Sequence, residues 1–169
     1  MTIADDLTPL EILGVAIKSE IEAANLYRYM AGQVANLDLQ QRLGFLVQEE
    51  EKHRHILEGA YARQFPDVEL ALPARSLVPT IQAAIQAGAP VPELFGLAME
   101  AERLSEEFYD KLASRAPEEN SRTMLTYLSR MEHGHYELLR TELEMIQRFP
   151  TYYQVKEFQL GDELIHLGP

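Results

Sequence analysis

The sequence has no cysteine and no tryptophan among its 169 residues. Without cysteine the chain can form no disulfide, thiolate zinc site, iron–sulfur cluster or cysteine nucleophile. Basic residues are also scarce, with 15 lysines and arginines against 27 aspartates and glutamates, for a formal net charge of −12. Nucleic acids and anionic membrane surfaces are bound mainly through lysine and arginine, so we predict neither as a partner.

The sequence also lacks an apolar run of the roughly 20 residues that a membrane-spanning helix needs. Its N-terminal region carries Asp5, Asp6 and Glu11, whereas a secretory signal begins with positive charge. A chain of this length buries one hydrophobic core by default. We therefore predict one cytoplasmic domain, and we ask whether all of its surplus carboxylates lie on the surface.

Apolar residues recur three and four positions apart along most of the chain, which predicts an all-α protein. Thr8, Pro9 and Glu11 form a helix-start signal, with a capping threonine, a proline at the first helical position and a glutamate three residues after the cap. We predict four long helices, at about residues 9–35, 38–64, 92–115 and 119–148.

The second and third helices are separated by a segment rich in proline, with five prolines between positions 66 and 92. A short helix over Thr80–Ala87 fits inside it, stopped by Gly88. The other two connections are short, so they join antiparallel neighbours. The predicted architecture is a four-helix bundle of the ferritin type, over residues 1–150, with a long crossover at about 66–91. We expect the tail 151–169 to pack on the bundle or on a partner chain.

The second and fourth predicted helices carry the same pattern of five residues, 82 positions apart. The pattern is Leu43, Leu46, Glu50, His53 and Leu57, repeated as Leu125, Leu128, Glu132, His135 and Leu139. Steps of three and four residues put each set on one stripe of its helix. Because the leucines indicate that the stripe faces the core, the glutamates and histidines are predicted to face it too.

The first and third predicted helices repeat at the same offset. Glu20 corresponds to Glu102, and Tyr27 corresponds to Tyr109. Each of these glutamates shares its helix stripe with apolar residues, so each helix also directs one carboxylate inward. The four helices together bring four carboxylates and two imidazoles to one depth of the bundle.

An unpaired ionised carboxylate is costly to bury, so four of them call for a cation. Two divalent metals would balance their charge, and oxygen and imidazole ligands without thiolate suit iron or manganese. A glutamate on two helices and Glu-x-x-His on the other two is the signature of carboxylate-bridged dimetal bundles. The predicted ligands are Glu20, Glu50, His53, Glu102, Glu132 and His135. The alternative is a bundle whose core polar residues satisfy one another. A further Glu-x-x-His, at Glu163 and His166, has no partner helix and is interpreted as chance.

These residues resemble the rubrerythrin branch of the ferritin-like superfamily, over about residues 9–148. The resemblance implies a pair of iron ions, with manganese as the alternative, that reacts with hydrogen peroxide or dioxygen. It implies terminal ligands at Glu20, Glu102, His53 and His135, and bridging ligands at Glu50 and Glu132. Tyr27, with Tyr109 as its repeat, matches the tyrosine that the family places beside its ligands. Such a tyrosine holds a ligand in place or donates a proton to reduced oxygen, and the alternative is a core aromatic residue satisfied by a nearby carboxylate.

Two features depart from the family pattern. Full-length rubrerythrins carry a cysteine-ligated rubredoxin domain that supplies electrons, and this sequence has no cysteine, so we expect an external electron donor. Rubrerythrins also tend to have an extra glutamate on the third helix, where this sequence has Ser105 and then Glu106. We expect Glu106 at the surface, together with His55 and His133.

Three functions remain open from the sequence. The first is a diiron oxidoreductase that reduces hydrogen peroxide or dioxygen in oxidative-stress defence. The second is a ferroxidase or iron-storage protein, and the third is a metal-stabilised bundle without turnover. We expect a homodimer, and the long crossover would permit helix pairs to be exchanged between chains. Glu49, Glu51 and Lys52 are interpreted as solvated helix surface.

Overall fold

The computed structural model describes residues 7–74 and 76–154. The elements within these ranges are all helical: α1 (Pro9–Gln33), α2 (Leu37–Gln64), α3 (Thr80–Ala87), α4 (Val91–Arg115), α5 (Glu119–Arg148) and α6 (Pro150–Tyr153). The prediction of an all-α chain with four long helices is confirmed, with helix ends that differ from the predicted ones by two residues or fewer.

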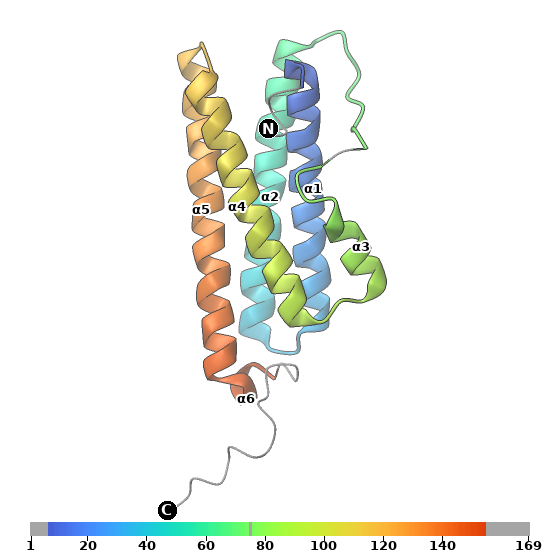
Figure 1. Ribbon diagram of the computed structural model, residues 1–169, viewed down its shortest axis with the longest axis vertical. Coiled ribbons are helices and arrows are strands. Elements are labelled where there is room, and N and C mark those ends of the chain that lie inside the picture. The colour runs from blue at the N-terminus through green and yellow to red at the C-terminus, as the bar shows by residue number, and fades with distance from the viewer. Residues whose placement is uncertain (1–6, 75, 155–169) are drawn as a thin grey trace, which may run out of the picture.

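The four long helices form two antiparallel hairpins, α1 with α2 and α4 with α5 (Figure 1). The hairpins meet where α1 contacts α4 and where α2 contacts α5. The crossover runs from the end of α2 back along the bundle to the start of α4, so α2 and α4 point the same way (Figure 1). This connection makes the bundle ferritin-like, as predicted, rather than a simple up-and-down bundle.

Local signals in the sequence explain where the helices begin and end. Thr8 and Glu11 form the predicted capping box, in which each side chain bonds the backbone N–H of the other. Asn36 caps α2 by accepting a bond from the backbone N–H of Leu39 at 2.9 Å. Gly88 ends α3 in the left-handed region, with a φ of 68° that favours glycine.

The crossover is fastened to α1. Lys18 Nζ donates to the carbonyl oxygens of Pro73 and Ala74 at 2.9 and 2.5 Å. Ser19 Oγ accepts a bond from the backbone N–H of Leu77 at 3.1 Å. At Gly14 a Cβ would lie 3.1 Å from Pro73 Cδ, so the absence of a side chain lets the crossover approach closely. These contacts place the crossover beside the middle of the bundle.

The core follows the leucine stripes, because all six leucines of the repeated pattern are buried. The first residues of the predicted tail contact the bundle. Tyr153 is buried, and the Tyr152 hydroxyl donates to Asp38 Oδ2 at 2.7 Å. The rest of the tail, including Phe158 and the pair Glu163 and His166, lies outside the described residues. Among the helices described, none combines the length and the apolar character required to cross a bilayer.

Candidate metal centre

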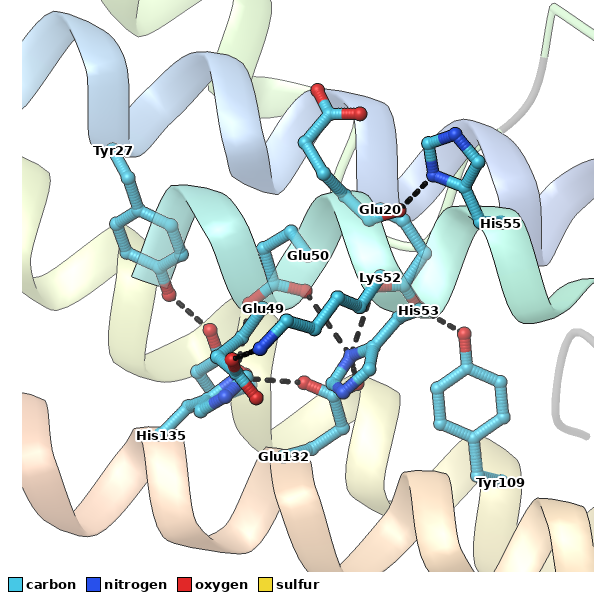
Figure 2. Close-up of polar contacts among 12 residues, drawn as sticks. Glu20, Tyr27, Glu49, Glu50, Lys52, His53, His55, Tyr109, Glu132 and His135 are labelled. Carbon is cyan, nitrogen blue, oxygen red and sulfur yellow. Dashed lines mark hydrogen bonds and ion pairs between the residues drawn. The ribbon is translucent and has the colours of Figure 1, made fainter. Parts of the chain in front are cut away.

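The structure brings the six predicted residues together in the bundle interior. Figure 2 shows five of them, Glu20, Glu50, His53, Glu132 and His135. The six come from all four long helices: Glu20 from α1, Glu50 and His53 from α2, Glu102 from α4, and Glu132 and His135 from α5. Each is at most 3% exposed. The inward direction that the stripes predicted is therefore observed for every one of them.

Two of the glutamates span the pair of histidines. Glu50 places Oε1 2.9 Å from Nδ1 of His135 and Oε2 3.5 Å from Nδ1 of His53. Glu132 places Oε1 3.0 Å from Nδ1 of His53 and Oε2 3.4 Å from Nδ1 of His135. The two oxygens of each carboxylate thus point to different imidazoles.

The other two glutamates each approach one histidine. Glu20 Oε2 lies 3.5 Å from Nδ1 of His53, and Glu102 Oε2 lies 3.5 Å from Nδ1 of His135. The two imidazole rings are stacked, with centroids 5.3 Å apart and planes 17° from parallel. Each contact in one half of the site has a counterpart 82 positions away, so the repeat in the sequence appears as an approximate two-fold symmetry.

The two predicted tyrosines connect the hairpins. The hydroxyl of Tyr27 donates to Glu102 Oε1, and the hydroxyl of Tyr109 donates to Glu20 Oε1 (Figure 2). Burial, and next the charge of the accepting glutamate, raise the pKa of each tyrosine well above its usual value of 10. Both phenols therefore stay protonated and remain donors at neutral pH.

Burial shifts the titration of the metal-free site. It raises the pKa of Glu20 from 4.5 to about 8, with Glu50 adding to the rise and His53 opposing it. Burial and three neighbouring glutamates raise the pKa of Glu132 well above 4.5. For His135 burial acts to lower the pKa, but Glu102, Glu132 and Glu50 outweigh it and raise the value to about 12. The pKa of His53 is raised in the same way.

Several buried atoms of the site make no well-aligned hydrogen bond, although carboxylate oxygens lie 2.9–3.5 Å from the Nδ1 atoms of the two histidines. The atoms without such a bond are Oε1 of Glu50, Oε1 of Glu132, and both ring nitrogens of His53 and of His135. Buried polar atoms are seldom left unsatisfied, so each needs an explanation. These four residues can bring one ligand atom each to within 4.8 Å of one another. A buried set of carboxylate oxygens and imidazole nitrogens at that spacing fits a divalent metal.

The exposure of the residues around the cluster agrees with the sequence-based predictions in part. His55 and His133 are exposed, as predicted. Glu106 is partly buried and lies 3.2 Å from Nδ1 of His133, outside the cluster. The interpretation of Glu49 as solvated surface is wrong, because it is buried and paired with Lys52 one turn away. Glu49 lies three residues after Leu46 and four before His53, so the helical spacing places it at the edge of the inward stripe.

One aromatic residue near the site was missed by sequence reasoning. Tyr127 of α5 lies with its ring edge toward His53, at a centroid distance of 6.4 Å. It is 45% exposed, so it connects the surface on the α2–α5 side with one imidazole. No motif in the sequence points to it, because its place depends on how α5 packs against α2.

Comparisons with known proteins agree with this geometry. A sequence model of a family described as Rubrerythrin matches residues 11–143. The solved structure of a hypothetical protein from Pyrococcus furiosus is similar, with 32% identity, a TM-score of 0.73, and coverage of 88% of this chain and 95% of that chain. A comparison with curated proteins found no match.

Proposed function

The chain belongs to the rubrerythrin family, and on that premise we propose that it is a non-haem dimetal oxidoreductase that reduces hydrogen peroxide. The observation that carries the proposal is the buried set of carboxylate oxygens and imidazole nitrogens of Glu50, His53, Glu132 and His135, which lie within 4.8 Å of one another and make no well-aligned hydrogen bonds. Iron is the proposed metal, and manganese suits the same ligands.

The distances in the site support two kinds of ligand, bridging and terminal. Glu50 and Glu132 each direct two oxygens toward different histidines, as a carboxylate does when it bridges two metals. Glu20 and Glu102 each approach a single histidine, as terminal ligands do. We therefore assign one metal to Glu20 and His53, the other to Glu102 and His135, and a shared role to Glu50 and Glu132.

Charge balance supports two metals rather than one. Four ionised carboxylates carry four negative charges, and two divalent ions cancel them. A single divalent ion would leave a net negative charge in the buried core, where an uncompensated charge is costly. When bound, two ferrous ions would supply the two electrons that reduce hydrogen peroxide to water.

The tyrosines act on the ligands. Tyr27 and Tyr109 hold one oxygen each of Glu102 and Glu20, which leaves the second oxygen of each carboxylate for a metal. Such partners of metal ligands orient them and tune their basicity. Because both phenols stay protonated, either one can also supply a proton to reduced oxygen. The chain itself has no cysteine, so we propose that a separate reductant restores the reduced site.

Anaerobic stopped-flow mixing tests this function. The protein is loaded with two equivalents of iron(II) and mixed with equal concentrations of hydrogen peroxide or dioxygen. We expect peroxide to oxidise the site at least about tenfold faster, a difference of about 1.4 kcal/mol in barrier height. Faster reaction with dioxygen would instead favour a ferroxidase, and an unchanged absorption spectrum with both oxidants would favour a metal-stabilised bundle without turnover.

A ligand variant provides the control for that experiment. Glu50→Ala or Glu132→Ala removes a carboxylate that spans both histidines, so we expect loss of metal loading with the helical fold retained. Glu58→Ala changes a carboxylate on α2 that pairs with Arg54 at 3.5 Å, and should load normally. Two metals per chain in Glu50→Ala or Glu132→Ala would contradict the ligand assignment.

A further inference from the structure

A small cavity reaches the candidate metal centre from one side of the bundle. It has a volume of about 10 Å³, close to the space that one water molecule occupies. Its floor includes Glu50, Glu102 and Glu132. Oε1 of Glu50 and Oε1 of Glu132 make no well-aligned hydrogen bond, so the cavity is lined by carboxylates that could accept a ligand.

The walls of the cavity are small side chains where α1 faces α4. Ser19 and Ala23 come from α1, and Ala101 and Ser105 come from α4. These positions are related by the 82-residue repeat, so the cavity lies along the approximate two-fold axis of the site. Larger side chains at these positions would fill it, because protein interiors are closely packed.

The roof of the cavity is the end of the crossover, through Leu77 and Val78, and the first turn of α3, through Ile81. A hydrogen bond of 3.1 Å from the backbone N–H of Leu77 to Ser19 Oγ holds this roof on α1. The roof is apolar on its lower side, and it separates the carboxylates of the floor from solvent.

A charged residue stands at the edge of the cavity. Glu22 lines it, and its side chain is 16% exposed. Its carboxylate lies 3.8 Å from Nζ of Lys18, which also donates to the carbonyl oxygens of Pro73 and Ala74. Glu22 is therefore the outermost of a row of carboxylates that continues inward to the site.

We propose that divalent metal ions reach the Glu/His cluster through this crevice between α1 and α4, with Glu22 as the first carboxylate they meet and residues 76–81 as a cover that moves aside. The inference rests on the proposed metal centre. A hydrated ion is larger than the cavity, so the bond between Leu77 and Ser19 has to open during uptake. The negative charge of Glu22 raises the local concentration of cations at the mouth.

The test is the kinetics of cobalt(II) uptake by the metal-free full chain, followed by visible absorption in a stopped-flow instrument. Glu22→Gln should slow uptake roughly three- to tenfold at low salt, and the difference should shrink at high salt. Glu58→Gln is the matched control, because Glu58 also pairs with a base four residues earlier, Arg54, at 3.5 Å. It should take up cobalt at the wild-type rate.

The cover is tested by Ser19→Ala, which removes the acceptor of the Leu77 N–H. We expect uptake and release of cobalt both to become faster, with the equilibrium dissociation constant within about twofold of wild type, because a barrier affects both directions equally. A change of the dissociation constant without a change of the uptake rate would contradict a role in the route. Circular dichroism checks that each variant remains helical.

The opposite side of the site provides the competing route. Tyr127 is 45% exposed, and its ring lies 6.4 Å from that of His53. If Tyr127→Ala accelerates uptake while Glu22→Gln and Ser19→Ala leave it unchanged, metal enters between α2 and α5 and the proposal is wrong. If the wild-type chain binds no cobalt, the proposed metal centre itself is overturned.

Discussion

Glu20 is one of the site residues whose pKa changes on folding. Its pKa rises from 4.5 to about 8 because burial disfavours the charged form. The folded chain therefore prefers the protonated carboxyl. The stability that this preference contributes is fully present below about pH 4.5 and is lost as the pH rises to about 8.

We predict that the metal-free chain becomes less stable between pH 5 and pH 8, and that Glu20→Gln loses much of this dependence. Glutamine keeps the acceptor for Tyr109 but cannot ionise, so the two unfolding free energies should diverge by an amount on the order of a few kcal/mol. Urea unfolding in the presence of a chelator measures it. The unfolding free energy of Glu58→Gln should depend on pH as in the wild type. If the unfolding free energy of Glu20→Gln also shows the wild-type pH dependence, the raised pKa of Glu20 is wrong.

The hydrogen bonds of Tyr27 and Tyr109 to the glutamates provide a second test of the site. Tyr27→Phe and Tyr109→Phe each remove one donor to a glutamate of the site, and we predict that each weakens metal binding about 10- to 100-fold. The approximate symmetry predicts similar losses for the two variants. A competition titration against a coloured chelator measures them. Tyr152→Phe, which loses a hydrogen bond to Asp38 far from the site, should bind metal with wild-type affinity. A large difference in metal affinity between Tyr27→Phe and Tyr109→Phe would contradict equivalent roles for the two tyrosines.

The crossover packs closely against α1 at Gly14, a position without a side chain. A Cβ at Gly14 would lie 3.1 Å from Pro73 Cδ, which is closer than carbon atoms normally pack. At Gly96 of α4 a Cβ would meet no atom within 4 Å. Glycine disfavours a helix by about 1 kcal/mol relative to alanine, so both positions would gain propensity from the same substitution.

We predict opposite results for this pair. Gly96→Ala should raise the free energy of unfolding by about 0.5–1 kcal/mol. Gly14→Ala should lower it or leave it unchanged, because the new methyl group displaces Pro73 and with it the carbonyl that Lys18 binds. Chemical denaturation of the two variants measures the difference. An equal gain in both would mean that the crossover is loosely held.

For the whole molecule, the site unites the two hairpins, which also meet along α1–α4 and α2–α5. Its residues come from all four long helices, so a bound metal pair would act as a cross-link. At a free metal concentration of 100 times the dissociation constant, binding stabilises a fold by about 2.7 kcal/mol. For a chain of this size that corresponds to roughly 5–10 °C in melting temperature.

We therefore predict that iron(II) or cobalt(II) raises the melting temperature, that a chelator reverses the rise, and that loading in weak buffer releases protons. The protons come from groups such as Glu20 and Glu132, whose pKa values are raised in the metal-free core. Differential scanning calorimetry and a pH electrode make the two measurements. Loading without acidification would be inconsistent with carboxyls clustered as described.

The sequence predicts a homodimer, and one end of the bundle exposes apolar side chains that could form its interface. Leu37, Phe149 and Tyr152 are large exposed side chains at the end of the bundle where the α1–α2 turn meets α6 (Figure 1). We predict by light scattering a particle of twice the chain mass of 19.3 kDa, and a smaller particle for Leu37→Glu. A closed shell of many copies would support the storage function instead.

The sequence alone determined the helix ends and the inward stripes. Helix ends depend on local signals, such as the caps at Thr8 and Asn36 and the proline at position 66, just after α2. The direction of a stripe depends only on the spacing of residues within one helix. For this reason the repeat could identify all six inward residues of the site before any contact between helices was known.

Only the tertiary structure decided which of these residues meet. Tyr27 lies seven positions from Glu20 on α1, yet it bonds Glu102 of the opposite hairpin. The approach of Tyr127 to His53 and the cavity beneath Leu77 likewise follow from how distant helices are packed. Periodicity reports the direction of a side chain around its own axis, whereas a contact between helices depends on their relative height, rotation and separation, which the whole core sets together.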